Sequence, residues 1–157
     1  MGRPRVLVMV ILMSLASLGA WGQTVAGEVV LVVEVDPRVL QGGPVLLNLA
    51  LQDRREFDDA RITPRYSRSV EITPESLGEA PLELVFTGVE AGEFVVSGYI
   101  DTNRDGRLTM GLFGPTEPWG MAGLRRPLLA RPRFDSLKLS LPRDVSSDNN
   151  KILLKIK

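Results

Sequence analysis

The chain has 157 residues, carries equal numbers of basic and acidic residues, and contains neither cysteine nor histidine. Without these two residue types it has no disulfide, thiol nucleophile, imidazole base or histidine zinc ligand, which excludes most familiar hydrolase designs. The balanced charge also argues against nucleic acid as a partner, because proteins that bind DNA or RNA normally carry a basic excess.

Residues 1–22 have the three parts of a signal peptide. Arg3 and Arg5 give a positive start, residues 6–18 form an apolar run broken only by serine, and small residues precede the expected cut. We therefore expect a single exported domain over residues 23–157, secreted or periplasmic, with 17 basic and 19 acidic residues and a net charge of −2. The less favoured alternative is an uncleaved anchor helix, because the apolar run is shorter than the ~20 residues that span a bilayer.

Short apolar segments separated by glycine and proline predict β-strands in the first half of this domain. Residues 28–35 and 44–52 are rich in valine and leucine and are predicted to pair as a hairpin. Residues 53–59 are interpreted as a charged connector. Residues 66–73 alternate as a strand with apolar side chains facing inward, and their other, polar face indicates the edge of a sheet.

The second half continues the β pattern. Residues 82–86 and 94–100 alternate around a glycine-bounded turn, and residues 137–141 and 151–157 predict two further strands. No stretch of the domain holds a helical period for ten residues. The pattern predicts an all-β fold, an antiparallel β-sandwich of about seven strands in which two sheets bury their apolar faces against each other. We expect a monomer with no transmembrane segment after the leader.

The most distinctive stretch is Asp-Thr-Asn-Arg-Asp-Gly-Arg-Leu, which begins at Asp101. In a calcium loop the side chains at positions one, three and five and the carbonyl at position seven bind the ion, while glycine at position six permits the turn. Asp101, Asn103, Asp105 and the carbonyl of Arg107 fill these four positions. The twelfth position is leucine where an acid is usual, and Glu117 is our candidate for the missing carboxylate.

The flanks of this loop differ from those of a helical calcium hand, because a strand enters it and a segment rich in glycine and proline leaves it. We therefore predict a weak β-loop site for Ca²⁺, with a dissociation constant of ~0.1–1 mM. The alternative is a tight Asp-Gly turn whose side chains only cap their own backbone. Arg104 and Arg107 weaken the local negative field and favour this alternative.

Several motifs occur in an order that resembles a known family. Residues 92–100 (GEFVVSGYI) lead into the acidic loop, and residues 114–120 (GPTEPWG) and 132–136 (PRFDS) follow it. In order and spacing these motifs are similar to the uncharacterised secreted bacterial family known as domain of unknown function 2141. The resemblance implies a transthyretin-like β-sandwich, within the broader immunoglobulin-like class of sandwiches. The chain departs from the family pattern at residues 121–123, where Met-Ala-Gly replaces an aromatic residue, serine and asparagine.

Glu117 and Trp119 have two interpretations. A carboxylate beside an aromatic ring can hold a sugar by hydrogen bonding and stacking, which would make the domain a glycan- or peptide-binding module. The alternative interpretation, which we favour, is that Trp119 is a core residue and Glu117 a metal ligand or turn acid. A glycosidase needs two carboxylates at a fixed separation across a cleft, and we regard a carboxylate-based hydrolase as the least favoured reading.

Two groups of arginines complete the inventory. Arg125, Arg126, Arg131 and Arg133 either bind phosphate or anionic lipid or form a solvated loop. Arg65 and Arg68, on the expected edge strand, are interpreted as protection against edge-to-edge aggregation. Altogether the sequence predicts a non-enzymatic module of the cell envelope with a calcium loop, and a glycan or an envelope protein as its partner.

Overall fold

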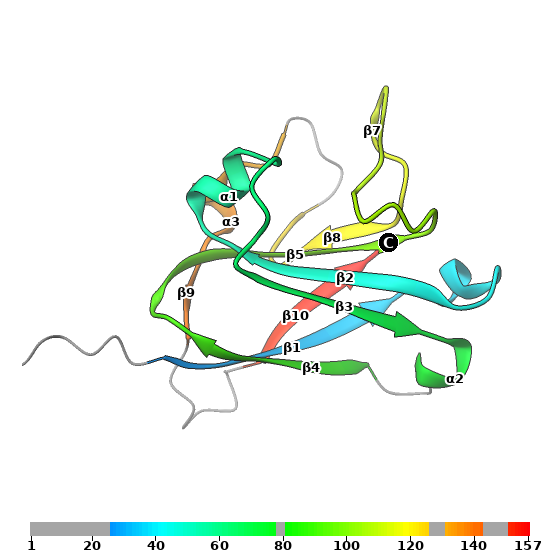
Figure 1. Ribbon diagram of the computed structural model, residues 1–157, viewed down its shortest axis with the longest axis horizontal. Coiled ribbons are helices and arrows are strands. Elements are labelled where there is room, and N and C mark those ends of the chain that lie inside the picture. Colours follow the sequence, from blue (N-terminus) through cyan, green and yellow to red (C-terminus); the bar gives the residue numbers. More distant parts are fainter. Residues whose placement is uncertain (1–25, 78–80, 126–130, 143–150) are drawn as a thin grey trace, which may run out of the picture.

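The strands of the computed structural model form two main sheets that face each other as a sandwich (Figure 1). The structure describes residues 26–77, 81–125, 131–142 and 151–157. One sheet has the order β10 (Lys151–Ile156), β1 (Gly27–Val35) and β4 (Leu82–Val89). The other has the order β3 (Tyr66–Ile72), β2 (Val45–Gln52), β5 (Gly92–Asp101) and β8 (Trp119–Met121), and β9 (Leu139–Leu141) also pairs with β5. The predicted all-β sandwich is confirmed.

The expected signal peptide, residues 1–22, lies outside the described residues, and so does Arg126. Within the described segments, every helix is too short or too polar to span a bilayer.

Short elements connect the strands. They are the 3₁₀ helix η1 (Pro37–Leu40), the helices α1 (Arg54–Asp58), α2 (Pro74–Leu77) and α3 (Phe134–Leu137), and a hairpin of β6 (Met110–Gly111) and β7 (Gly114–Pro115). Residues 53–59 lie in the connection between β2 and β3, as predicted, but they also contain the helix α1, which was not predicted. It begins with a capping box: the Asp53 carboxylate accepts the Glu56 N–H at 2.9 Å, and the Glu56 carboxylate accepts the Asp53 N–H at 3.0 Å.

The core between the sheets follows from the alternation of the strand sequences. Successive side chains of a strand point to opposite faces, so every second residue of β1, β2 and β10 faces inward. The side chains buried in this way include Val29, Leu31, Val33, Leu47, Leu49, Leu51, Ile152, Leu154 and Ile156. The edge position predicted for residues 66–73 is confirmed, since β3 is the first strand of its sheet.

The predicted hairpin between the first two strands is wrong. β1 pairs with β4 and β10, whereas β2 pairs with β3 and β5 in the other sheet. Between them the chain crosses from one sheet to the other through η1, where the Asp36 carboxylate accepts the Arg38 N–H at 3.0 Å. Of the strand pairs in the described residues, only β1–β10 is parallel, and it brings together the two ends of the domain.

The predicted strand at residues 137–141 is shorter in the structure. Leu137 ends α3, and only Leu139 to Leu141 pair with β5. Although apolar residues alternate over these five positions, they do not share one environment. Leu137 packs against the outer side of the sheet, in a cluster separate from that of Leu139 and Leu141.

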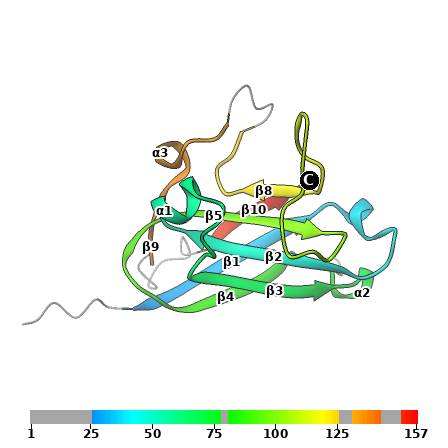
Figure 2. The ribbon, with the colours of Figure 1, turned by 45° about the horizontal axis from the view of Figure 1, so that its top comes forward.

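β5 is buried on both of its faces. Val96 and Ile100 point into the core between the sheets, and Val95 points to the opposite side. There it packs with Phe57 of α1 and Phe134 of α3, whose rings meet edge to face with centroids 5.9 Å apart. Figure 2 shows α1 and α3 lying together over this part of the sheet. The helices α1 and α3 therefore cover the outer face of β5 at Val95.

Backbone contact between β8 and β10 joins the two sheets along one side. The Trp119 N–H donates to the Lys157 carbonyl at 3.2 Å, and the Lys157 N–H donates to the Trp119 carbonyl at 3.4 Å. Gly120 lies so close to β10 that a Cβ atom there would be 2.0 Å from the carbonyl oxygen of Lys155. Only a residue without a side chain fits this contact.

We expect Gly120→Ala to lower the free energy of unfolding by roughly 1–3 kcal/mol or more, because the added methyl group must push β10 away from β8. Gly42→Ala is the matched control, since a Cβ atom there would meet nothing within 4 Å, and it should change the same quantity by less than about 1 kcal/mol. Urea unfolding followed by circular dichroism measures both variants. If both variants lost the same free energy of unfolding, the close contact between β8 and β10 would not be the cause of the loss.

A candidate metal-binding loop at the end of β5

Asp101 ends β5 and is completely buried, with 0% of its surface exposed. Its two carboxylate oxygens accept the backbone N–H groups of Asp105 at 3.2 Å and Gly106 at 2.8 Å. These bonds fold the following residues back over the end of the strand. The φ angles of Arg104 and Gly106, 59° and 77°, lie in the left-handed region that so tight a return requires. Asp101 therefore fixes the shape of the loop.

Asn103 and Asp105 lie on the same turn. The Asn103 Oδ1 accepts the Asp105 N–H at 3.1 Å, and the Asp105 Oδ1 accepts the Arg107 N–H at 2.8 Å. The Asn103 Nδ2 donates to the Asp105 Oδ2 at 3.0 Å and to the Thr109 Oγ1 at 3.3 Å. The structure thus brings together the side chains at the first, third and fifth positions of the motif, as its spacing predicts, and it adds Thr109 to them.

Glu117 holds the loop from the segment that follows the β6–β7 hairpin, and it is only 6% exposed. One carboxylate oxygen accepts the N–H and the hydroxyl of Thr102, at 2.8 and 3.0 Å, and the other accepts the N–H of Thr109 at 3.0 Å. Burial raises the pKa of Glu117, but the hydrogen bonds from Thr109 and Thr102 lower it by more, so its pKa lies below the ordinary value. Glu117 is therefore ionised at neutral pH and clamps the loop at two points.

The carboxylates of Asp101, Asp105 and Glu117 concentrate negative charge at this end of the sheet. No ion pair within the described residues joins any of the three to a lysine or arginine. Arg104 is instead directed to Glu71 on β3, at 3.1 Å. Burial, together with the charges of the three carboxylates, raises the pKa of Tyr99 to about 12.

The carboxylates alone do not make a metal site. In the described part of the chain, no three Asp, Glu, His or Cys side chains converge closely enough to ligate one ion. A cation at this loop would have to be held by carboxylates together with the side-chain oxygen of Asn103 and the main-chain oxygen of Arg107. Such an all-oxygen set suits a hard cation.

The less favoured interpretation of Glu117 and Trp119, a ligand-binding surface, is wrong. Trp119 is 9% exposed and belongs to the buried residues, as does Glu117. A sugar ring stacks on an exposed aromatic face, and this ring offers none in the folded domain. The alternative interpretation, that Trp119 is a core residue, is confirmed.

The arginines of the edge strand connect the two sheets. The Arg68 guanidinium donates to the Val85 carbonyl of β4 at 3.0 Å, and Arg65 pairs with Glu90 at 2.9 Å. Both side chains thereby bridge the side of the sandwich between β3 and β4, and their role against edge-to-edge aggregation stays a prediction. Of the second arginine group, the described members Arg125, Arg131 and Arg133 are all exposed.

Sequence reasoning missed the residues that fix Glu117. Thr102 and Thr109 donate to it mainly through their backbone N–H groups. Every residue except proline carries such a group, so the sequence contains no signal that singles out these two.

The fold and the loop define a class of protein: a β-sandwich whose central strand ends in a buried acid that organises an Asp-x-Asn-x-Asp-Gly loop. Residues 33–149 match the profile of a family described as "Uncharacterized protein conserved in bacteria (DUF2141)". The match covers most of the chain, and the protein belongs to this family, as its motifs predict. No curated protein and no solved structure shows significant similarity to the chain.

We expect Glu117→Gln to lower the free energy of unfolding by roughly 1.5–3 kcal/mol at neutral pH, because the amide NH₂ would face the N–H of Thr102 or Thr109. Folding lowers the pKa of Glu117, so its contribution is present above the pKa of the unfolded chain, near 4.5, and is lost as the pH falls below it. Between about pH 5 and pH 3, the stability of the unsubstituted protein should therefore fall more steeply than that of the variant.

Chemical unfolding at a series of pH values measures this difference. Glu28→Gln, which changes an exposed carboxylate on β1, is the control and should keep the steep profile. If Glu117→Gln kept it as well, the clamp would not be the source of the pH dependence.

Proposed function

We propose that this protein is a secreted or periplasmic, non-enzymatic module of the cell envelope in which a weakly bound calcium ion stabilises the loop at residues 101–117. The observation that carries the proposal is the fully buried Asp101 carboxylate, which lies near two further carboxylates and has no cationic partner among the described residues. Buried charges in proteins are normally paired or coordinate a metal.

The proposed ligands are the side-chain oxygens of Asp101, Asn103 and Asp105 and the carbonyl oxygen of Arg107. The hydrogen bonds that Asp101 accepts from backbone amides leave acceptor capacity for an ion, because each carboxylate oxygen has two lone pairs. For the same reason Glu117 remains the candidate for a further carboxylate ligand, although its bonds to Thr102 and Thr109 already give it a structural role.

A low affinity is consistent with this arrangement. Most of the donor groups are engaged in hydrogen bonds of the loop itself, and Arg107 adds a positive charge within it. Both effects reduce the gain from binding a cation. A dissociation constant of ~0.1–1 mM belongs to the range of extracellular calcium modules. The proposed location outside the cytoplasm therefore agrees with the proposed affinity.

The role that we propose for the ion is structural. The loop connects β5 to the β6–β7 hairpin and to Glu117, so an ion bound there would stiffen one end of the sandwich. An envelope protein remains the expected partner of such a module.

The proposal predicts that calcium raises the melting temperature. With a dissociation constant of ~0.1–1 mM, about 10 mM calcium adds roughly 1.4–2.7 kcal/mol to the free energy of unfolding. For a domain of this size the melting temperature should rise by roughly 3–10 °C. Differential scanning calorimetry of the protein in calcium, in magnesium and in chelator measures the effect.

Asp105→Asn tests the loop itself, because Asp105 is exposed and its replacement leaves the buried Asp101 in place. We expect this variant to lose the calcium-dependent rise, whereas Asp58→Asn, at an exposed residue of α1, should retain it. Identical melting temperatures of the unsubstituted protein in calcium and in chelator would refute the proposed site and leave the alternative of a metal-free turn.

A further inference from the structure

The β6–β7 hairpin gathers exposed apolar side chains at its tip. Leu112 and Phe113 are 97% and 104% exposed, and Met110 is 66% exposed. These three are the majority of the five large hydrophobic residues that the described part of the chain exposes, the others being Val85 and Leu153. Single exposed apolar residues are normal on a protein surface, but a concentration of them marks a contact site.

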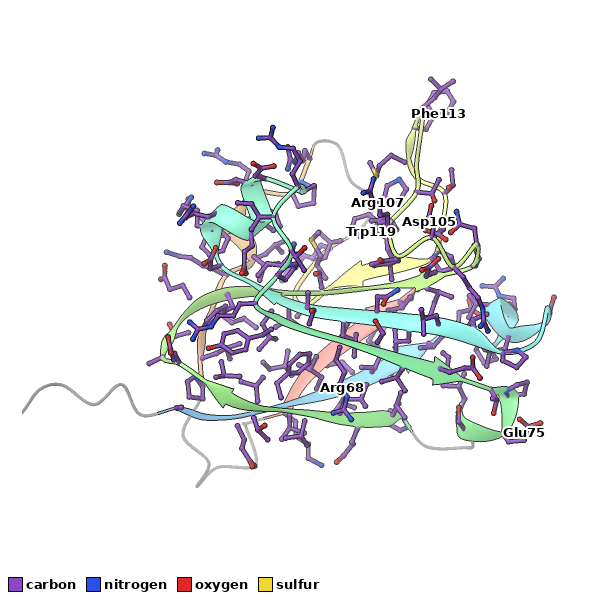
Figure 3. All side chains as sticks on the ribbon, viewed as in Figure 1. Arg68, Glu75, Asp105, Arg107, Phe113 and Trp119 are labelled. Carbon is purple, nitrogen blue, oxygen red and sulfur yellow. The ribbon has the colours of Figure 1, made fainter. Side chains whose placement is uncertain are left out.

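The turn does not require apolar residues. Met110 pairs with Pro115 and Gly111 with Gly114, so Leu112 and Phe113 occupy the two turn positions between the paired residues. Such positions usually hold glycine, asparagine or aspartate, which suit the backbone of a tight turn. Figure 3 shows Phe113 at the end of the projecting hairpin, pointing away from the sandwich. Neither side chain contributes to the core, and so their apolar character serves another purpose.

The base of the hairpin is firmly held. The Thr116 N–H donates to the Thr109 carbonyl at 3.0 Å, and the Thr109 N–H donates to Glu117 at 3.0 Å. The tip is therefore presented on a fixed support, and part of its backbone is already paired within the hairpin.

A lipid bilayer fits this tip better than a protein pocket. A stable protein interface buries at least ~1,000 Å² in total, of which two side chains on a two-residue turn supply only a fraction. The interfacial region of a bilayer needs no complementary shape, and it accepts leucine and phenylalanine readily where the nearby backbone groups are paired.

The surrounding charge allows the same contact. Arg107 is exposed and lies between the hairpin and the sheets, on the side of the molecule from which the tip projects (Figure 3). Cations in this position attract anionic headgroups. The carboxylates of Asp105, Asp101 and Glu117 lie at the same end of the sheet and oppose this attraction, so the apolar side chains would supply the binding.

We propose that Leu112 and Phe113 insert into the interfacial region of a lipid bilayer and dock the sandwich on a membrane surface. Burial of each side chain strengthens binding by roughly tenfold or more, and a contact of two residues is therefore weak and reversible. The proposal goes beyond the calcium-stabilised module and does not rest on it, because the exposure of the tip is independent of any bound ion.

Two tryptophan reporters at exposed apolar positions test the proposal in the full chain. Phe113→Trp places the reporter at the tip, and Leu153→Trp places it on β10, where the native side chain is 45% exposed. Each variant is mixed with vesicles of equal parts phosphatidylglycerol and phosphatidylcholine, with and without brominated acyl chains that quench tryptophan. The emission of the unsubstituted protein, which has two tryptophans of its own, is subtracted.

We expect the emission of Phe113→Trp to shift to the blue and to be quenched by brominated lipid, whereas Leu153→Trp should show neither change. Adding Leu112→Ser to Phe113→Trp should weaken the quenching. Each variant is the full chain with one reporter, and so any membrane binding by residues 1–22 affects both samples alike. Thermal melts without vesicles verify that the variants are folded.

Three results would overturn the proposal: no change in Phe113→Trp, equal quenching of both reporters, or a blue shift that grows with protein concentration in the absence of lipid. The last would show that a second copy of the chain covers the tip. Repeating the measurement in calcium and in chelator separates the two proposals, since insertion that persists in chelator supports docking even if calcium has no effect on melting.

Discussion

Burial of β5 on both faces is the constraint on which the rest of the structure depends. Its backbone pairs with β2 along one edge and with β8 and β9 along the other. Its inward side chains lie in the core between the sheets, and Val95 on its outer face packs against α1 and α3. Such a strand cannot end in unsatisfied polar groups, because a buried donor or acceptor without a partner is costly. Where β5 ends at the buried Asp101, the following loop must therefore supply donors, and the N–H groups of Asp105 and Gly106 do so.

The strands could be predicted where the evidence for them is local. Alternation with a period of two is visible within a few residues, and it predicts the strands β3, β4 and β10. α1 was missed, although its capping residues Asp53 and Glu56 stand in the sequence, because a helix of five residues shows no period. The pairing of β1 was also beyond local reasoning, since its partners β4 and β10 come from much later in the chain.

The candidate site was likewise predictable only where the evidence is local. The spacing of Asp101, Asn103 and Asp105 predicted that their side chains share one turn, and the choice of Glu117 for the missing carboxylate predicted its contact with the loop. The sequence left both an exposed and a buried Trp119 open, because the environment of this residue is set by its approach to β10 and not by its neighbours in sequence. Whether a side chain is buried depends on the tertiary fold. Here the burial of Trp119 and Glu117 excludes a sugar-binding surface formed by these two residues.

The loop and the hairpin together form one surface, which has a charged base and an apolar tip. The base presents the exposed carboxylate of Asp105 above the buried ones of Asp101 and Glu117. Taking an ionised group out of water costs far more free energy than burying a leucine or phenylalanine returns. Insertion at a bilayer must therefore stop at the hairpin, which limits docking to a shallow depth. A cation bound at the base would reduce the negative charge that faces anionic headgroups. Calcium binding and membrane docking, although separately testable, would then reinforce each other through the same loop.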